Sequence, residues 1–146
     1  MSTGGEIVPY ETQADFSNEE RVAKILADKW RCQMQRNKPL SAFDYIAHRG
    51  GKPTAFVELR RRSISFHKYL TVIVSITKFT SAKTHTEVTG LPCLFVCEWI
   101  DEIGYINLDC KKDFVLSGEG WNRRNPSHEV EVIGHIKTSD FILLEL

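Results

Sequence analysis

Two acidic residues are spaced so that they could hold a divalent metal ion, with a cation beside them that could hold a phosphate. Asp44 lies upstream of Glu58, and Arg60 follows Glu58 by two residues. Carboxylates bind Mg²⁺ as hard oxygen ligands, and the ion lowers the pKa of a bound water and stabilises charge on a phosphate. Residues two apart on a strand project from the same face about 7 Å apart, so Arg60 would stand beside Glu58. This combination is what a divalent-metal hydrolase needs.

A β-hairpin is predicted to carry these residues. Two apolar-containing runs, Leu40 to His48 and Thr54 to Arg61, are separated by a segment rich in glycine, proline and basic residues. Strand alternation puts Asp44 on one face of the first run and puts Glu58 and Arg60 together on one face of the second. Charged residues therefore occupy positions where an apolar residue would suit a core better.

Helices are predicted on either side of the hairpin. Ser17 and Glu20 form a capping box, and apolar residues at helical spacing follow, which predicts a helix over 18–35. Asn-Lys-Pro comes shortly afterwards and ends it, because the residue before proline is pushed out of the α region. A second helix is predicted over 75–89, with Gly90 as its stop signal.

The remaining chain reads mainly as strands. A β-branched segment precedes the second helix, and a continuous apolar run typical of a central strand follows it, with a neighbouring strand across a turn. The expected extended segments are a short one within Tyr69–Ile76 before the helix, then Pro92–Trp99, Gly104–Leu108, Glu129–Lys137 and an apolar edge over Phe141–Leu146. Residues 117–128 are expected to form a loop. Up to residue 108, the order of the main elements is helix, strand, strand, helix, strand, strand.

Together these residues and this order resemble the PD-(D/E)XK nuclease superfamily. The matching segments are Phe43-Asp44-Tyr45, Val57-Glu58-Leu59-Arg60, Ser75-Ile-Thr-Lys78 and Thr89-Gly-Leu-Pro92 leading into Cys93–Glu98. They extend over roughly residues 17–110. The resemblance implies an α/β fold with a restriction-endonuclease-like core, a small mixed sheet flanked by two helices, with extra C-terminal strands.

The resemblance also implies roles for individual residues. Asp44 and Glu58 would bind Mg²⁺ or Mn²⁺, and the backbone carbonyl of Leu59 would be a further ligand. Glu19 could join them as a first-helix acid, since it shares a helical face with apolar residues; alternatively it is an ordinary acid favoured by the helix dipole. The implied reaction is cleavage of a DNA phosphodiester bond.

Two positions depart from the family pattern. Phe43 stands where the family has proline, a change that leaves the carboxylate in place. Arg60 replaces the family's lysine; arginine is a planar fork that stays protonated, whereas lysine is a compact ammonium. Lys78 could supply the missing ammonium from the second helix. Glu58 and Arg60 could instead form a surface ion pair, and the chain could be an inactive binding or structural module that keeps the fold.

The charge of the chain restricts how it could contact DNA. It has 19 Lys plus Arg and 19 Asp plus Glu, which argues against coating nucleic acid by bulk electrostatics, so contacts must come from local patches. The candidate nucleic-acid-binding residues are Arg61, Arg62, Lys68, Trp121, Arg123 and Arg124. Small size suggests a structure-selective enzyme of the resolvase kind, or a subunit of a larger assembly. Resolvases of this kind act as dimers, so the resemblance allows a homodimer.

Other functional classes find less support in the sequence. Cys32, Cys93, Cys97 and Cys110 form no CxxC pair, so a structural zinc site is not expected. No apolar run approaches a membrane span, and the first ten residues lack the features of a secretory signal, so a cytoplasmic protein is expected. Residues 1–15 are expected to form a flexible arm, and 16–146 one nuclease-like domain.

Overall fold

The computed structural model describes residues 13–108, 115–119 and 131–146. Over these ranges the chain forms a mixed α/β fold, as expected. The elements in chain order are α1 (Gln13–Trp30), β1 (Gln33–Arg36), β2 (Tyr45–Arg49), β3 (Lys52–Arg61), β4 (Thr71–Ser75), α2 (Ile76–Thr89), β5 (Cys93–Glu98), β6 (Ile103–Asn107), β7 (Val115–Glu119), β8 (Glu131–Lys137), a 3₁₀ turn (Thr138–Asp140) and β9 (Ile142–Leu143).

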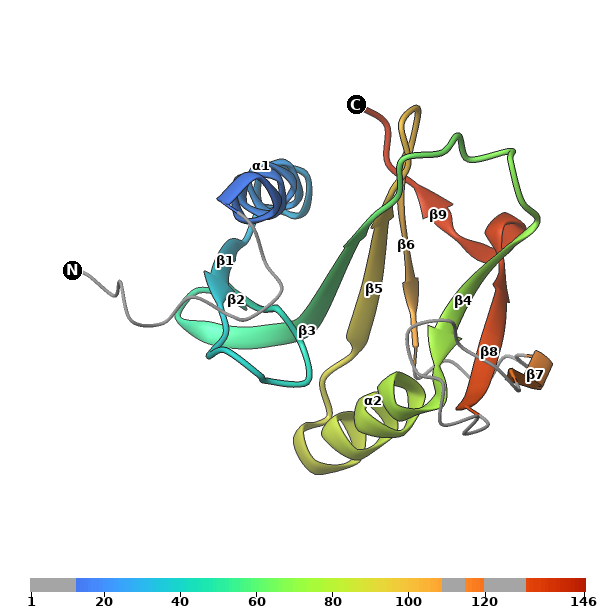
Figure 1. The fold of residues 1–146 in the computed structure, drawn as a ribbon. Helices are drawn as coiled ribbons and strands as arrows, with labels where there is room; N and C mark the ends of the chain where they lie inside the picture. Colours follow the sequence, from blue (N-terminus) through green and yellow to red (C-terminus); the bar gives the residue numbers. More distant parts are fainter. Residues whose placement is uncertain (1–12, 109–114, 120–130) are drawn as a thin grey trace.

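The strands form two sheets. The first sheet has the order β1-β2-β3-β5-β6-β9, and the second has the order β4-β8-β7. The first sheet is mixed because β3 and β5 run parallel while its other pairs are antiparallel. Figure 1 shows α1 beside β1, β2 and β3 at one side of the molecule, the second sheet at the other, and α2 below.

Two apolar clusters hold these layers together. On one face of the first sheet, Val22 and Leu26 of α1 pack against Tyr45, Val57 and Val96. The other face contributes to a second cluster, which also contains residues of α2, β4 and β8. Buried members of that cluster are Phe43, Val72, Val74, Ala82, Cys93, Phe95, Cys97, Trp99, Ile106, Leu108, Ile136 and Phe141. The first sheet is therefore covered by α1 on one face and by α2 with the second sheet on the other.

The hairpin and the second helix agree with the sequence prediction. Tyr45 of β2 pairs with Val57 of β3, and the turn between the strands contains Gly50 and Gly51 at positive φ, which suits glycine. The side chain of Ser75 accepts a hydrogen bond at the start of α2, and Gly90 ends this helix in the left-handed conformation. The first strand of the hairpin begins at Tyr45, later than expected, so Asp44 lies just before it.

The first helix was predicted incorrectly at both ends. In the described residues it begins at Gln13, so Ser17 lies inside α1 and not at its cap, and 13–15 belong to the helix and not to an arm. It ends at Trp30, because Arg31 adopts a positive φ of 52°. The following residues form β1, which pairs with β2. Strand pairing here overrides the helical tendency of the local sequence.

Two further expectations need adjustment. Residues 117–119 belong to β7 and not to a loop; 1–12, 120–128 and 129–130 lie outside the described residues. The apolar C-terminal edge is a strand of only two residues, β9, preceded by the buried Phe141. In the part of the chain that the structure describes, no helix is long and apolar enough to cross a membrane.

The position of α2 depends on a close approach to the second sheet. A Cβ atom added at Gly134 of β8 would lie 2.4 Å from Cε2 of Phe79 on α2. Phe79 is the neighbour of Lys78 in the sequence. The absence of a side chain at Gly134 therefore sets how closely the helix that carries Lys78 packs on β8.

We expect Gly134→Ala to lower the free energy of unfolding by about 1–3 kcal/mol, because the new methyl group overpacks the contact with Phe79. In a Phe79→Leu background the same change should cost less, because the shorter side chain no longer reaches the methyl group. Urea unfolding of the four proteins of this double-mutant cycle measures both values. An equal cost in both backgrounds would contradict the assigned contact.

Candidate active site

The candidate site lies where the pairing of β3 with β2 ends. β2 pairs with the first half of β3, up to Val57, whereas β5 pairs with its second half, Phe56–Arg61. Asp44 directly precedes β2, and continuing the register Tyr45↔Val57 by one position brings Asp44 opposite Glu58. The two acids predicted from the sequence therefore meet where the two strands separate.

The side chain of Asp44 accepts a hydrogen bond from a backbone N–H of β3 that lies beyond the end of the pairing with β2. Its Oδ2 accepts a hydrogen bond of 2.9 Å from the backbone N–H of Leu59. The N–H groups of Phe56 and Arg62 donate to carbonyls on the β5 side, so the alternation of the strand turns Leu59 toward the opposite edge. The N–H and the carbonyl of Leu59 therefore both project toward Asp44.

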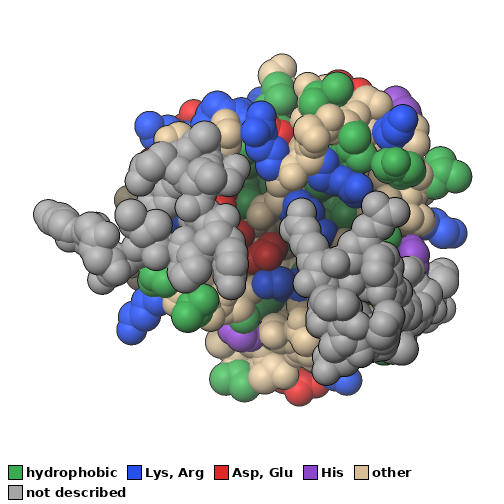
Figure 2. Space-filling model, viewed as in Figure 1, with side chains coloured by type: hydrophobic (Ala, Val, Ile, Leu, Met, Phe, Trp, Pro, Cys, Tyr) green, Lys and Arg blue, Asp and Glu red, His purple; other side chains and the backbone are tan. Residues whose placement is uncertain are grey.

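Glu58 lies in a mostly buried position and pairs with α2. Its side chain is 16% exposed, and its Oε2 lies 3.1 Å from Nζ of Lys78. Nζ of Lys78 also donates to the carbonyl of Ala42 and lies 5.3 Å from the centre of the Phe43 ring. The predicted reach of Lys78 from the helix into the site is thus present. Figure 2 shows acidic and basic side chains side by side in a recess near the centre of this face.

The pKa of Glu58 is raised to about 7, mainly because burial disfavours its charged form and also because Asp44 is a nearby negative charge. The positive charges of Lys78 and Arg60 act in the opposite direction without cancelling the shift. Two carboxylates thus share a partly dry site in which one of them is not fully ionised at neutral pH. Such a pair would be stabilised by an added cation.

Arg60 is near Glu58, but its guanidinium group is used elsewhere. Its Nη1 donates a hydrogen bond of 2.6 Å to the carbonyl of Ile73 on β4, and the group lies 5.1 Å from the centre of the Phe95 ring. Arg60 therefore links the first sheet to the edge strand of the second. An exposed ion pair between Glu58 and Arg60, the alternative considered from the sequence, is wrong, because Glu58 is mostly buried and pairs with Lys78.

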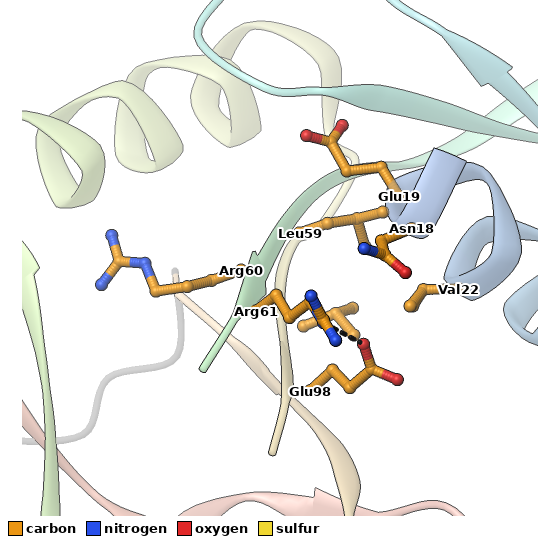
Figure 3. A pocket seen from close by; sticks show the side chains of 8 residues that line it. Asn18, Glu19, Val22, Leu59, Arg60, Arg61 and Glu98 are labelled. Atoms are coloured by element: carbon orange, nitrogen blue, oxygen red, sulfur yellow. Dashed lines mark ion pairs between the residues drawn. The ribbon is translucent and has the colours of Figure 1, made fainter. Parts of the chain in front are cut away.

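Glu19 faces the sheet, as predicted, but pairs with Arg36 of β1 at 3.0 Å. Arg36 in turn donates to the hydroxyl of Tyr45, and burial raises the pKa of Tyr45 to about 12. Glu19 also lines a pocket of about 280 Å³ between α1 and the ends of β3 and β5, together with Asn18, Val22, Leu59, Arg60, Arg61, Val96 and Glu98. Figure 3 shows Arg60 extending away from Glu19, Asn18 and Val22.

The acids do not form a larger cluster. In the described ranges, no group of three or more His, Cys, Asp and Glu side chains is placed to hold a metal ion. A metal ion at this site would therefore rely on Asp44 and Glu58, supplemented by backbone oxygen and water. Among the described residues, Cys32, Cys93 and Cys97 form no disulfide, and Cys110 lies outside the described residues.

The basic residues predicted to contact nucleic acid are only partly described. Arg61 lies on the α1 side of β3 and pairs with Glu98 at 3.6 Å, as Figure 3 shows. Arg62 and Lys68 follow in the segment that leads to β4. Trp121, Arg123 and Arg124 lie outside the described residues.

An aromatic wall next to the site was not predicted. His85 of α2 packs edge-on against Phe43 and Phe56, with ring centres 5.1 and 4.9 Å away. Its Nδ1 lies 2.7 Å from the carbonyl of Ser81, so the ring is also fixed to its own helix. The spacing of seven between Lys78 and His85 places both on one helical face and could have signalled this.

The fold of the described residues is the one that the sequence resemblance implies for a PD-(D/E)XK nuclease core. The model of a family described as phage putative PDDEXK endonuclease matches residues 8–144, and the chain therefore belongs to this family. The superfamily resemblance seen in the sequence is confirmed.

One solved structure with a similar fold is Hjc, a Holliday junction resolvase from Archaeoglobus fulgidus, with a TM-score of 0.54. The match covers 89% of this chain and 90% of that chain at 14% sequence identity, so the likeness concerns the fold. No curated protein matches the chain.

The raised pKa of Glu58 makes a prediction about stability. A carboxyl group whose pKa rises from 4.5 to about 7 on folding stabilises the fold below pH 4.5, and this contribution is lost as the pH rises through 7. Without divalent metal, Glu58→Gln should therefore gain stability relative to the wild type between pH 5 and pH 8, by on the order of 3 kcal/mol. Thermal unfolding across this pH range measures the difference.

The control for loss of a carboxylate is Glu87→Gln, at an exposed position of α2. Its stability relative to the wild type should not change with pH in the same way. A Glu58→Gln difference that stays constant from pH 5 to pH 8 would show that Glu58 titrates as an ordinary exposed carboxyl group.

Proposed function

We propose that this chain is a metal-dependent endonuclease that hydrolyses phosphodiester bonds in DNA. The observation that carries the proposal is the pairing of two carboxylates, Asp44 and Glu58, in a partly buried site next to the Lys78 ammonium group. A partly buried pair of like charges destabilises the fold, and a cation that binds between the two carboxylates would remove this cost. Membership of a phage endonuclease family supports the same proposal.

The residues present fit Mg²⁺ or Mn²⁺. Asp44 and Glu58 supply carboxylate oxygens, and the carbonyl of Leu59, which projects from the same strand edge as the N–H bound to Asp44, supplies a third oxygen. When bound, the ion would activate a water molecule and stabilise charge on the phosphate. Glu19 would contribute only after exchanging its contact with Arg36.

The two cations near Glu58 are proposed to have different roles. Lys78 has the compact ammonium that can lie against an attacking water or a phosphate oxygen, and it already lies 3.1 Å from Glu58. Arg60 holds β4 through the carbonyl of Ile73, so we assign it a positioning role that keeps the second sheet beside the site. Its charge still favours the ionised form of Glu58.

The proposed substrate is DNA of a particular shape, such as a junction or flap. The likeness of the fold to that of a Holliday junction resolvase supports this choice. A homodimer would bring two sites to two strands, which a resolvase-like reaction requires. For a nuclease of a phage family, the expected place of action is the cytoplasm of the host cell.

A second candidate is a binding or structural module that keeps the fold without catalysis. It is favoured by the small number of converging acids within the described residues and by the ion pair with Lys78, which neutralises Glu58 without a metal ion. Metal binding separates the two candidates. The catalytic proposal needs Asp44 and Glu58 to bind a divalent ion, whereas the module does not.

The central test is cleavage of supercoiled, single-stranded and branched DNA with Mg²⁺ or Mn²⁺. We expect cleavage that requires the metal ion and prefers branched DNA. Asp44→Asn and Glu58→Gln should each reduce the rate by more than about 100-fold, because each removes a carboxylate charge from the ion and the phosphate. Absence of both cleavage and calorimetric metal binding in the folded wild type would favour the non-catalytic module.

The assignment of the two cations gives a separate prediction. Lys78→Ala should lower kcat by about 100-fold, because it removes the ammonium group nearest the proposed reaction. Arg60→Gln should lower kcat by less than about tenfold but reduce stability by about 1–3 kcal/mol, since it leaves the carbonyl of Ile73 without its donor. Cleavage rates and urea unfolding measure the two effects.

Lys83→Ala, at an exposed position of α2, is the matched control for loss of a positive charge from this helix. It should change neither quantity appreciably. If Arg60→Gln abolishes cleavage at unchanged stability while Lys78→Ala remains active, the roles of the two cations are the reverse of those assigned here.

A further inference from the structure

A groove lies beyond the candidate site, at the end of β3. It has a volume of about 380 Å³ and is bounded by the end of β3, the segment that follows it and β4. Its lining residues are Arg60, Arg61, Arg62, Ser63, Ile64, Tyr69 and Ile73. Arg60 and Glu58 belong to the same face of β3, so the groove continues from the face that carries the proposed reaction.

The positive charges of the groove differ in how strongly they are engaged. Arg60 is held by the carbonyl of Ile73, and Arg61 pairs with Glu98 although its side chain is 61% exposed. Arg62 makes no ion pair with any side chain in the described ranges. Lys68 lies 6.0 Å from the centre of the Tyr69 ring and adds a further exposed charge. Arg62 and Lys68 thus remain available to bind an anion.

Tyr69 gives the groove an aromatic surface. Tyr69 is 53% exposed, and it lines the groove together with Ile73, which is 47% exposed. An aromatic ring that the core does not bury, next to cations in a groove, matches the combination by which proteins bind single-stranded nucleic acid. The bases stack on the ring, and the phosphates contact the cations.

A duplex fits this groove less well than an unpaired strand. The bases of a duplex are stacked on one another, so their faces are not accessible to a side chain. In addition, Arg61 and Arg62 project from opposite sides of the chain at the end of β3, so one flat duplex surface would not contact both. An unpaired nucleotide can present its base to Tyr69 and its phosphate to Arg62.

We infer that Tyr69 and Arg62 bind an unpaired nucleotide of the substrate near the cleavage site. This inference rests on the proposed nuclease function and specifies its substrate class: DNA with a single-stranded segment next to the duplex, such as a flap or fork. Arg62 follows Glu58 by four residues of extended chain, about 13 Å. The bound nucleotide is therefore a few nucleotides away from the phosphate that is cleaved.

The test measures binding in EDTA, where cleavage does not interfere. Fluorescence anisotropy compares a fork carrying two single-stranded arms with a fully paired duplex of equal length. Tyr69→Ala should weaken binding of the fork about tenfold and leave binding of the duplex unchanged, whereas Tyr69→Phe, which keeps the ring, should bind like the wild type. Leu70→Ala is the matched control, because Leu70 is the more exposed neighbour and does not line the groove.

Two further measurements distinguish stacking from a general loss of affinity. A 2-aminopurine base in the single-stranded arm should be quenched by the wild type and by Tyr69→Phe, but not by Tyr69→Ala. Arg62→Gln should weaken fork binding and reduce the slope of log affinity against log salt by about 0.7, the value for one phosphate contact on a single strand.

The inference is overturned if Tyr69→Ala weakens fork and duplex equally, or weakens neither, while its unfolding curve matches the wild type. That result would leave the proposed nuclease function intact wherever metal-dependent cleavage is observed. Conversely, a wild type that binds forks through Tyr69 but never cleaves DNA would contradict the proposed catalysis and support the binding of an unpaired nucleotide in the groove.

Discussion

The candidate site depends on the separation of β2 from β3 after Val57. Where β2 stops pairing, the backbone of β3 presents polar groups that need partners, and the carboxylate of Asp44 satisfies the N–H of Leu59. This hydrogen bond fixes the Asp44 side chain opposite Glu58. The carbonyl of Leu59 is left on the same edge. Because β3 extends beyond the end of its pairing with β2, the side chains of Asp44 and Glu58 and the carbonyl of Leu59 come together.

The same geometry explains how the chain tolerates arginine at position 60. The long, forked side chain of Arg60 crosses to the carbonyl of Ile73 and the Phe95 ring, so its charge is near Glu58 but its donors are used by the second sheet. The compact ammonium of Lys78 comes from α2 and occupies the space beside Glu58. Lys78 therefore pairs with Glu58, whereas Arg60 joins the two sheets, because an ammonium group is compact and a guanidinium group is forked.

The sequence predicted the features that depend on local pattern and missed those that depend on distant contacts. The hairpin and α2 with Gly90 follow from alternation and turn residues, whereas the placement of Lys78 beside Asp44 and Glu58 was implied by the family resemblance. The conversion of the expected helix end into β1 required knowledge of its pairing with β2. The contact of Arg60 with Ile73 could not be predicted either, because Ile73 belongs to β4 and no local sequence pattern specifies where β4 lies relative to β3.

The position of Lys78 links stability to function in this fold. Its helix is held against β8 by the contact of Phe79 with Gly134, and against the first sheet by His85 between Phe43 and Phe56. These contacts are apolar and strengthen the fold, whereas the carboxylate pair opposite Lys78 weakens it, since burial and mutual repulsion raise the pKa of Glu58. A rigid apolar surround is what allows two like charges to remain close together. The proposed preorganisation of the site for a cation would therefore depend on the fixing of the helix that carries Lys78 on both sheets.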